Sequence, residues 1–311
     1  MNCSIAMLAG PDDAGHVRLL FNHAIRTSGI SFRHRALTLD TLPSVRFPAG
    51  HASTARLQQT ARDMLAAGEI DVIHETSGHH HEIERKHFGR RLQRPRDFRG
   101  IPLLGWALGI ENTPTDYVCH FDCDILMHSV ADYSWIANAI EVLQTRQDVL
   151  FVAPMGGPSR RASAPREQKA FSSRRFVVDR RRFAGMLPLP PTHRSWKRKL
   201  LMNLGGASSY WPWESHVRSA IERSPLTCLY LGDPSAWSIH CPDHGPLWKA
   251  NLDALVRACE AGTYPPRQEG NVELELTAWL EQLANDGLPV HQEPKTDRAS
   301  GDATAAPTAP F

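Results

Sequence analysis

The order of apolar and polar positions in the first quarter of the chain predicts alternating strands and helices. Residues 4–8 form a short apolar run that stops at a Gly-Pro turn, which indicates a buried strand. In 16–28 the apolar residues recur at the spacing of one helix face. Similar patterns predict a strand at 35–39, a helix at 54–68 and a strand at 70–74. Because this order needs crossover connections, it predicts a parallel sheet with helices on its faces.

The alternation resumes after a polar, arginine-rich segment at 79–99, which we expect to be mobile. The later pattern predicts helices at 103–110, 131–143, 217–222, 247–261 and 272–284, and strands at 117–121, 149–154, 172–178, 226–231 and 236–240. A loop is expected at 156–169. Segment 292–311 has too little apolar bulk to offset the entropy of ordering, so we expect a disordered tail behind one domain at 1–291.

Composition excludes several classes of protein. Lys and Arg number 35 against 33 Asp and Glu, a net charge of +2, which argues against a nucleic-acid partner. No apolar run approaches the roughly 20 residues of a membrane-spanning helix, so no transmembrane segment is expected. The six cysteines form no CxxC pair, and 1–10 lacks the basic region of a secretory signal. These features favour a cytoplasmic protein with reduced thiols.

Asp122-Cys123-Asp124 is the sharpest local motif, and it follows the apolar strand at 117–121. Two carboxylates separated by one residue point the same way on an extended backbone. Both can then bind one Mg²⁺ or Mn²⁺, ions that prefer oxygen ligands, and such an ion stabilises a diphosphate leaving group. Open α/β sheets bind ligands at the carboxyl ends of their strands. That position favours a metal site, although the same residues also fit a solvated turn.

A family resemblance centres on this motif. The run from Arg99 to Gly109, Thr115-Asp116-Tyr117-Val118 and His120-Phe121-Asp122-Cys123-Asp124 resemble the nucleotide-sugar half of GT-A-fold glycosyltransferases, particularly the family-2-like group. Segment 171–180 and Trp213-Glu214 are similar to acceptor-side segments of such enzymes. The resemblance extends over 3–285 and is most specific at 99–128. It implies a GT-A-type, Rossmann-like α/β domain with a mostly parallel sheet flanked by helices, a nucleotide-binding half at 1–128 and an acceptor half at 129–291.

The resemblance also implies roles on the donor side. Asp122 and Asp124 match the motif that holds the metal and the diphosphate of the donor. Asp40, at the end of the second strand, matches an acid that contacts the nucleotide base or ribose, although it also fits a plain turn. Glu75 is a further residue that could face the nucleotide. The loop that lines the base is matched by Ala9, Gly10 and Pro11.

A displacement at the anomeric carbon needs a base for the acceptor hydroxyl, usually a carboxylate. Family members often carry Glu-Asp at the place where this chain has Glu214-Ser215, so Glu214 is the candidate base and His216 a second candidate. Glu214 also fits an acid favoured by a helix N-terminus. The resemblance further implies a third metal ligand from a C-terminal histidine, for which His240 is the candidate and His244 the alternative. Either histidine also fits a structural role.

Three other groups of residues suit either binding or structure. Arginines and lysines in 85–99 and 160–175 suit diphosphate binding, although solvated charge also explains each of them. The histidines at 79–81 look like a metal-binding tract, but consecutive histidines on a loop have no fixed geometry. Four aromatic residues suit stacking on a sugar or packing in a core: Trp196, Tyr210, Trp211 and Trp213.

The resulting hypothesis is a glycosyltransferase that uses Mn²⁺ or Mg²⁺. It would move a sugar from a nucleoside-diphosphate sugar, expected to be UDP-linked, to a hydroxyl of an unknown carbohydrate, lipid or small-molecule acceptor, with inversion implied by the resemblance. The alternative is a non-catalytic nucleotide-sugar-binding protein, suggested by Ser215 in place of the expected base. A nucleotidyltransferase ranks lower, because the turn at 9–13 carries a single glycine rather than a glycine-rich phosphate loop.

Overall fold

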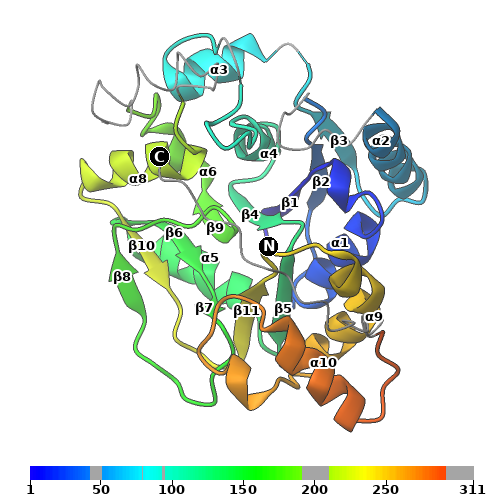
Figure 1. Cartoon of the computed structure of the whole chain (residues 1–311). Coiled ribbons are helices and arrows are strands. Elements are labelled where there is room, and N and C mark those ends of the chain that lie inside the picture. Colours follow the sequence, from blue (N-terminus) through cyan, green and yellow to red (C-terminus); the bar gives the residue numbers. More distant parts are fainter. Residues whose placement is uncertain (43–50, 79, 93–94, 191–209, 292–311) are drawn as a thin grey trace, which may run out of the picture.

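The computed structural model describes residues 1–42, 51–78, 80–92, 95–190 and 210–291. Its central sheet has eight strands in the order β3-β2-β1-β4-β9-β6-β10-β8 (Figure 1). These strands are β1 (Cys3–Ala9), β2 (His34–Leu39), β3 (Val72–Glu75), β4 (Tyr117–Asp122), β6 (Val149–Ala153), β8 (Arg166–Gln168), β9 (Arg175–Asp179) and β10 (Thr227–Tyr230). The pairs β3-β2, β2-β1, β1-β4 and β6-β10 are parallel, whereas β9 runs antiparallel to both its neighbours. The predicted α/β class with a mostly parallel sheet is confirmed.

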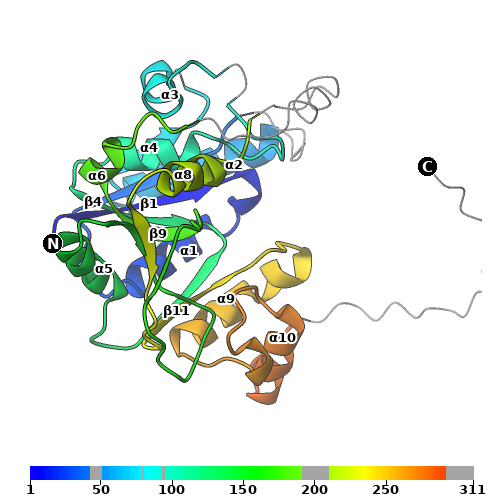
Figure 2. The same ribbon diagram turned by 90° about the vertical axis from the view of Figure 1, so that its left-hand side faces the viewer.

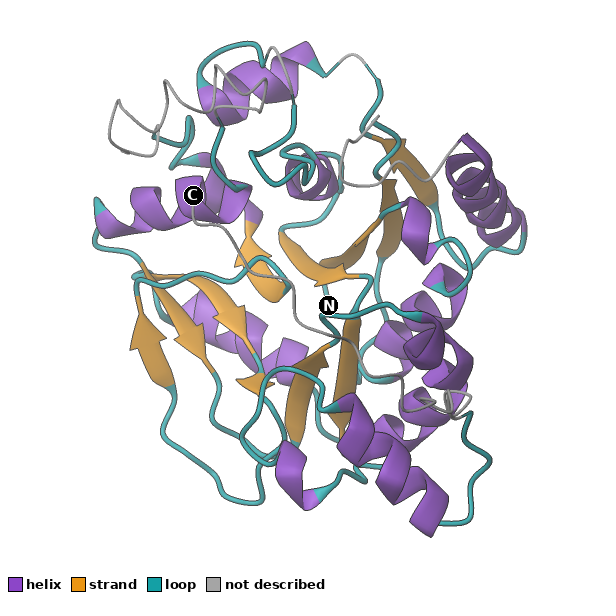
Figure 3. Cartoon of the chain, viewed as in Figure 1, coloured by secondary structure: helices purple, strands orange, loops and turns teal. Residues whose placement is uncertain are grey.

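A second, smaller sheet joins the first through the chain that leaves β4. It contains β5 (Ile125–Ser129), β11 (Ala236–His240) and β7 (Met155–Gly156), in the order β5-β11-β7. Figure 3 shows the strands of both sheets among the helices that enclose them. Strand β5 was not expected, because the predicted strand ended before Asp122-Cys123-Asp124 and the short apolar run after this motif was assigned to no element.

Helices cover both faces of the central sheet (Figures 1 and 2). One core is formed with α1 (Val17–Arg26), α2 (His51–Ala66), α5 (Trp135–Thr145), α9 (Pro246–Glu260) and α10 (Leu276–Asn285). The other is formed with α3 (His81–Phe88), α4 (Gly105–Glu111), α6 (Arg180–Ala184) and α8 (Trp213–Glu222). Along β1, Ile5 and Met7 face the first core while Ala6 and Leu8 face the second. Because both faces are covered, β1 is apolar at every position except Ser4, instead of alternating with polar residues.

Helix α3 lies in the segment expected to be polar and mobile. Ile83 and Phe88 pack against the second core, and His87 is buried. His87 Nε2 lies 2.9 Å from Glu111 Oε1 of α4, which ties the two helices together. The helix ends at Gly89, whose φ of 66° lies in the left-handed region favoured by glycine. The expectation was wrong because a buried polar pair, rather than an apolar stripe, anchors much of this helix.

Two other boundaries differ from the predicted ones. Strand β8 lies inside the predicted loop at 156–169, where it pairs antiparallel with β10 at the edge of the sheet. Helix α10 begins at Leu276, later than the predicted start at 272. The residues before it are held extended, since the His240 N–H donates to the Val272 carbonyl and the Leu274 N–H donates to the His240 carbonyl. The predicted tail at 292–311 lies outside the described residues, and the division into halves at 128 stays a prediction.

Two expectations from composition can be compared with the structure. All six cysteines are buried and free, as expected for reduced thiols. Within the described part of the chain, every helix is too short or too polar to cross a membrane.

Several buried histidines are held neutral. His23 in α1 is fully buried; its Nδ1–H donates to Glu260 Oε1 of α9 at 2.7 Å, and its Nε2 accepts from the Met127 N–H at 2.9 Å. A ring that accepts at one nitrogen is uncharged, so the nearby carboxylate does not make it an imidazolium. Burial lowers the pKa of His23, and it lowers that of His120 in β4 to about 3.

These histidines predict that acid destabilises the fold. Between pH 6.5 and 5 the unfolded chain takes up protons at these histidines that the folded chain does not bind, so their contribution to the free energy of unfolding falls as pH falls. His120 alone should remove about 2 kcal/mol at pH 5, given its ordinary pKa near 6.5. Urea unfolding at pH 7.5 and 5.0 measures the loss. His120→Asn should reduce it and His291→Asn, at an exposed position, should not. The same pH dependence in His120→Asn as in the wild type would contradict the prediction; total stability is not the criterion, because carboxyl groups with raised pKa values act in the opposite direction.

Candidate active site

The predicted site residues meet at one edge of the central sheet. Strands β1, β2 and β4 are parallel neighbours, with Ala9 paired to Leu39 and Leu8 paired to Asp122. Their carboxyl ends therefore lie together, as do the residues that follow them. Strand β9 is antiparallel to β4, with Arg175 opposite Phe121, so the start of β9 lies at the same edge. The 9–11 loop, Asp40, Asp122 and segment 173–175 thus come from four neighbouring strands.

Asp122, Cys123 and Asp124 form the crossing between the two sheets. The Asp122 N–H donates to the Arg174 carbonyl at 2.7 Å, and the Cys123 N–H donates to the Leu8 carbonyl at 3.1 Å. The Asp124 carbonyl accepts from the Cys241 N–H at 2.9 Å. Residues 123 and 124 form a turn and not an extended strand. The two carboxylates consequently have different surroundings, which the premise of an extended backbone did not foresee.

The Asp122 carboxylate is directed toward the second core. Its Oδ1 accepts from Trp106 Nε1–H of α4 at 3.0 Å and from His120 Nε2 at 2.9 Å. His120 is neutral, since burial lowers its pKa to about 3, so its Nε2–H is the donor. Burial and the neighbouring Asp124 carboxylate raise the pKa of Asp122 well above its ordinary value, against the Trp106 hydrogen bond.

Asp124 and His240 are brought together, as the sequence predicted for a shared site. His240 Nε2 lies 3.2 Å from Asp124 Oδ2, and its Nδ1 lies 2.6 Å from Glu273 Oε2. Arg174 Nη1–H donates to Glu273 Oε1 at 2.8 Å. Burial alone would lower the pKa of His240, but its bonds to the two carboxylates raise it. Asp124 Oδ1 is buried and has no hydrogen-bond partner.

The three predicted metal ligands are not equally close. Among the described residues, Asp122, Asp124 and His240 do not form a group whose ligand atoms all lie within 4.8 Å of one another. The hydrogen bonds from Trp106 and His120 hold Asp122 to one side, while Asp124 faces His240 across the turn. Asp124 and His240 are therefore paired, whereas Asp122 is a nearby carboxylate outside that pair.

Glu214 lies in the first turn of α8, after Pro212 at the N-cap. Burial raises the pKa of its carboxyl group, while Arg174 and a hydrogen bond from the Ser173 N–H lower it. Its charge also raises the pKa of Asp122, so the two groups sense each other. His216, the second candidate base, is turned away: its buried ring donates from Nδ1 to the Pro190 carbonyl at 3.1 Å, and burial lowers its pKa.

Asp40 forms a bidentate ion pair with Arg96, one of the basic residues of segment 85–99 for which the sequence predicted no specific partner. Arg96 Nη1 and Nη2 donate to the two Asp40 oxygens at 2.9 and 3.0 Å, and the Thr76 hydroxyl donates to Oδ1 at 3.1 Å. Burial raises the pKa of Asp40, and Arg96 opposes this. Arg96 also donates to the carbonyls of Leu42 and Gly100. The pair ties the segment after β2 to the loop before α4.

Asp13 holds the 9–11 loop through a hydrogen bond to its backbone. The Ala9 carbonyl accepts from the Asp40 N–H at 2.8 Å, and the Gly10 N–H donates to Asp13 Oδ2 at 2.7 Å. Pro11 begins the short 3-10 helix η1 (Pro11–Asp13). Glu75, at the end of β3, accepts from Gln58 Nε2 at 3.1 and 3.0 Å. Asp13 carried no role in the sequence analysis, although its position three residues after Gly10 is typical of a turn acid.

The remaining candidates divide between core and surface. Trp213 is fully buried and stacks on Trp106, with ring centroids 5.6 Å apart, so it is a core residue. Lys169 donates to the carbonyls of Ser224 and Leu226 at 2.9 and 2.6 Å, a structural role. Tyr210 and Trp211 contact Arg90 and Phe98 respectively. His79 and Trp196 lie outside the described residues.

A hollow of about 510 Å³ lies apart from this chemistry. It is lined by His128, Ser159, Trp237, Gly262 and Tyr264, among others. Because β5 and β11 are antiparallel, His128 pairs with Trp237 at one end of this ribbon while Ile125 pairs with His240 at the other. The candidate site therefore rests on the charged residues at the sheet edge and not on this hollow.

Comparisons with known proteins find likeness only among solved structures. No protein-family model matches the chain, and no curated protein matches it in sequence. The galactosyltransferase LgtC, in complex with donor and acceptor sugar analogues, is 12% identical with a TM-score of 0.39, covering 93% of this chain and 98% of that one. The mannosyltransferase PcManGT from Pyrobaculum calidifontis, in complex with GDP-Man and Mn²⁺, is 12% identical with a TM-score of 0.41, covering 83% and 61%. Glucosyl-3-phosphoglycerate synthase from Mycobacterium tuberculosis, in complex with Mn²⁺, UDP and glucosyl-3-phosphoglycerate, is 12% identical with a TM-score of 0.36, covering 93% and 81%. At these identities and TM-scores, the function of the chain is argued from the geometry of its own residues.

Proposed function

We propose that the chain is a metal-dependent glycosyltransferase that moves a sugar from a nucleoside-diphosphate sugar to an acceptor hydroxyl. UDP is the nucleotide that we propose for the donor. One observation carries the proposal. Three acidic groups, Asp122, Asp124 and Glu214, gather at the carboxyl edge of a largely parallel sheet, where burial, together with the charges of Asp124 and Glu214, raises the pKa of Asp122. Like charges held together by a fold are typical of a site completed by a cation and a substrate.

The donor set suits Mn²⁺ or Mg²⁺ at Asp124, with Asp122 and His240 as its further ligands. The partnerless, buried Asp124 Oδ1 supports this assignment, because a buried carboxylate oxygen needs a donor or a cation. His240 would bind through Nε2 after losing that proton, while Glu273 holds Nδ1–H, as a partner of a metal-bound histidine does. The bound cation would supply charge stabilisation to the departing diphosphate. Asp122 would reach it by turning from Trp106.

The residues of the chain would divide the transfer between them. Glu214, with a pKa raised by burial, would take the proton of the acceptor hydroxyl as its oxygen bonds to the anomeric carbon. The bond from that carbon to the diphosphate oxygen breaks in the same displacement, which inverts the configuration. Arg174 lowers the pKa of both Glu214 and Glu273, so its positive charge would offset the negative charge of the two carboxylates.

The nucleotide would occupy the ends of β1 and β2. Ala9, Gly10 and Pro11 would line the base, and Asp40 would contact the base or ribose. Both Asp40 oxygens already accept from Arg96, so the base or ribose would have to use a lone pair that this ion pair leaves open. The acceptor would enter between α8 and the start of β9, because Glu214 and the Ser173 N–H meet there.

Nucleotide binding should depend on a divalent cation. A ligand that binds only the folded chain raises its unfolding midpoint, by about 2.7 kcal/mol in free energy at a hundred times its Kd. UDP with Mn²⁺ should therefore raise the midpoint by several degrees, and UDP alone much less. Asp124→Ala should remove the cation-dependent part, whereas Asp253→Ala, at an exposed position on α9, should retain it. Differential scanning fluorimetry with UDP, GDP, dTDP and CMP measures this; no shift with any of them contradicts the donor site.

Glu214→Gln should separate turnover from binding. Removing a general base costs typically 10²–10⁴-fold in rate, so nucleoside-diphosphate release from sugar nucleotides should fall by about a thousandfold while the nucleotide-induced midpoint shift stays. In the wild type, release should also decline at acid pH through a pKa above the ordinary 4.5, because the base is then protonated. Glu222→Gln, at the other end of α8, is the matched control. Equal release from both variants would show that Glu214 is not the base, and nucleotide binding without any release by the wild type would indicate the non-catalytic binding protein.

A further inference from the structure

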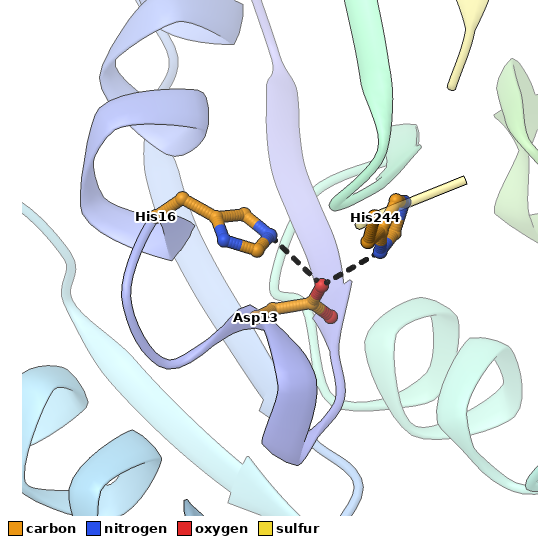
Figure 4. Close-up of side chains that lie close together, drawn as sticks. All are labelled: Asp13, His16 and His244. Atoms are coloured by element: carbon orange, nitrogen blue, oxygen red, sulfur yellow. Dashed lines mark hydrogen bonds and ion pairs between the residues drawn. The ribbon is translucent and has the colours of Figure 1, made fainter. Parts of the chain in front are cut away.

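A second group of potential metal ligands lies beside the proposed donor site. Asp13, His16 and His244 each offer one atom, and these atoms all lie within 4.8 Å of one another. Figure 4 shows the three side chains converging, with Asp13 between the two rings. Asp13 Oδ1 is 3.1 Å from His16 Nε2 and 3.7 Å from His244 Nδ1. Two ligands about 2.1 Å from one tetrahedral ion lie about 3.4 Å apart, so the observed spacings need only small adjustments.

The atoms that would not bind an ion are already held. The Gly10 N–H donates to Asp13 Oδ2 at 2.7 Å, which leaves Oδ1 facing the histidines. His244 Nε2 lies 3.0 Å from the Cys241 carbonyl; a carbonyl only accepts, so Nε2 carries the proton. In neutral His244 the lone pair is therefore on Nδ1, the atom that faces Asp13. A backbone carbonyl that orients the far side of a histidine is the usual support of a metal ligand.

Trp248 of α9 supports both rings. His244 stacks on it with centroids 4.7 Å apart at 19°, and His16 meets it edge-on at 4.9 Å and 86°. Trp248 is fully buried, so this platform belongs to the first core. The side chains of His16, Asp13 and His244 keep 5, 13 and 24% of their area exposed, so water reaches the group mainly at His244.

We propose that Asp13, His16 and His244 bind a divalent transition-metal ion such as Zn²⁺ or Co²⁺. Two imidazoles and one carboxylate favour such ions over Mg²⁺ and Mn²⁺, which prefer oxygen. The site adjoins the proposed donor-site cation, because His244 Nε2 lies 3.9 Å from Asp124 Oδ2, but it uses the other ring nitrogen, Nδ1, which faces Asp13. It does not rest on the proposed function. Three ligands leave at least one position for water or a substrate atom.

The bound ion would also join two parts of the chain that are far apart in sequence. Asp13 ends η1 and His16 precedes α1, whereas His244 lies between β11 and α9. The ion would thus fix the connection after β1, which carries Gly10, to the connection after His240. Because an ion that binds only the folded chain stabilises it, Zn²⁺ should raise the unfolding midpoint without any nucleotide.

The test is a Zn²⁺ and Co²⁺ titration of the whole chain after removal of metal with EDTA, in the absence of nucleotide, followed by calorimetry and by Co²⁺ absorption. One ion per chain is expected, bound more tightly than Mn²⁺ or Mg²⁺. Asp13→Asn, His16→Gln and His244→Gln should each weaken binding by at least about a hundredfold. Should the buried positions fail to fold, His244→Gln, the most exposed of the three, decides the result.

Two sets of controls keep this site apart from others. His291→Gln, at an exposed histidine, should bind Zn²⁺ like the wild type, which excludes general surface binding. Asp124→Asn and His240→Gln should also retain the ion, although they remove the proposed donor-site cation. Unchanged Zn²⁺ affinity in His244→Gln would overturn the proposal, as would loss of Zn²⁺ in Asp124→Asn with retention in Asp13→Asn. Because no nucleotide is present, a failed donor site would leave these results unaffected.

Discussion

The backbone hydrogen bonds at the crossing between the two sheets are the constraint on which the rest of the site depends. Within three residues the chain pairs with β1, with the residue before β9 and with the residue after β11. Strands on both sides therefore fix the backbone of Asp122 and Asp124, so that only rotation of the side chains can reorient the two carboxylates. As a result the two side chains diverge: Asp122 is directed toward Trp106 and Asp124 toward His240.

Charge is the second organising feature of this edge. Burial raises the pKa values of Asp40, Asp122 and Glu214, and each carboxyl group has different neighbours that oppose this shift. Asp40 has a bidentate arginine, whereas Glu214 has a more distant Arg174 and one backbone N–H. Asp122 has two neutral donors, and no cationic side chain of the described residues forms a hydrogen bond with it. The satisfied pair at Asp40 explains local rigidity, while the uncompensated acids mark where a cation and a substrate would contribute most.

Buried aromatic rings connect the polar edge to both cores. Trp106 and Trp213 stack beneath Asp122 in the second core, and Trp248 lies beneath His16 and His244 in the first. The same arrangement makes the site sensitive to packing: a shift of α4 would move the donor to Asp122, and a shift of α9 would separate the two histidines. The geometry of the site therefore depends on how α4 and α9 pack against the sheet.

The sequence by itself determined the alternating elements, the α/β class and the grouping of Ala9, Asp40 and Asp122 at strand ends, because apolar periodicity and parallel topology are read from neighbouring positions. It also pointed to Asp124 with His240, by resemblance. Only the tertiary structure decided that Arg96 clamps Asp40, that Trp106 holds Asp122 and that Asp13 and His16 meet His244. These partners are separated by up to 231 positions of chain, and their pairing follows from how helices pack on a twisted sheet, which no local pattern records.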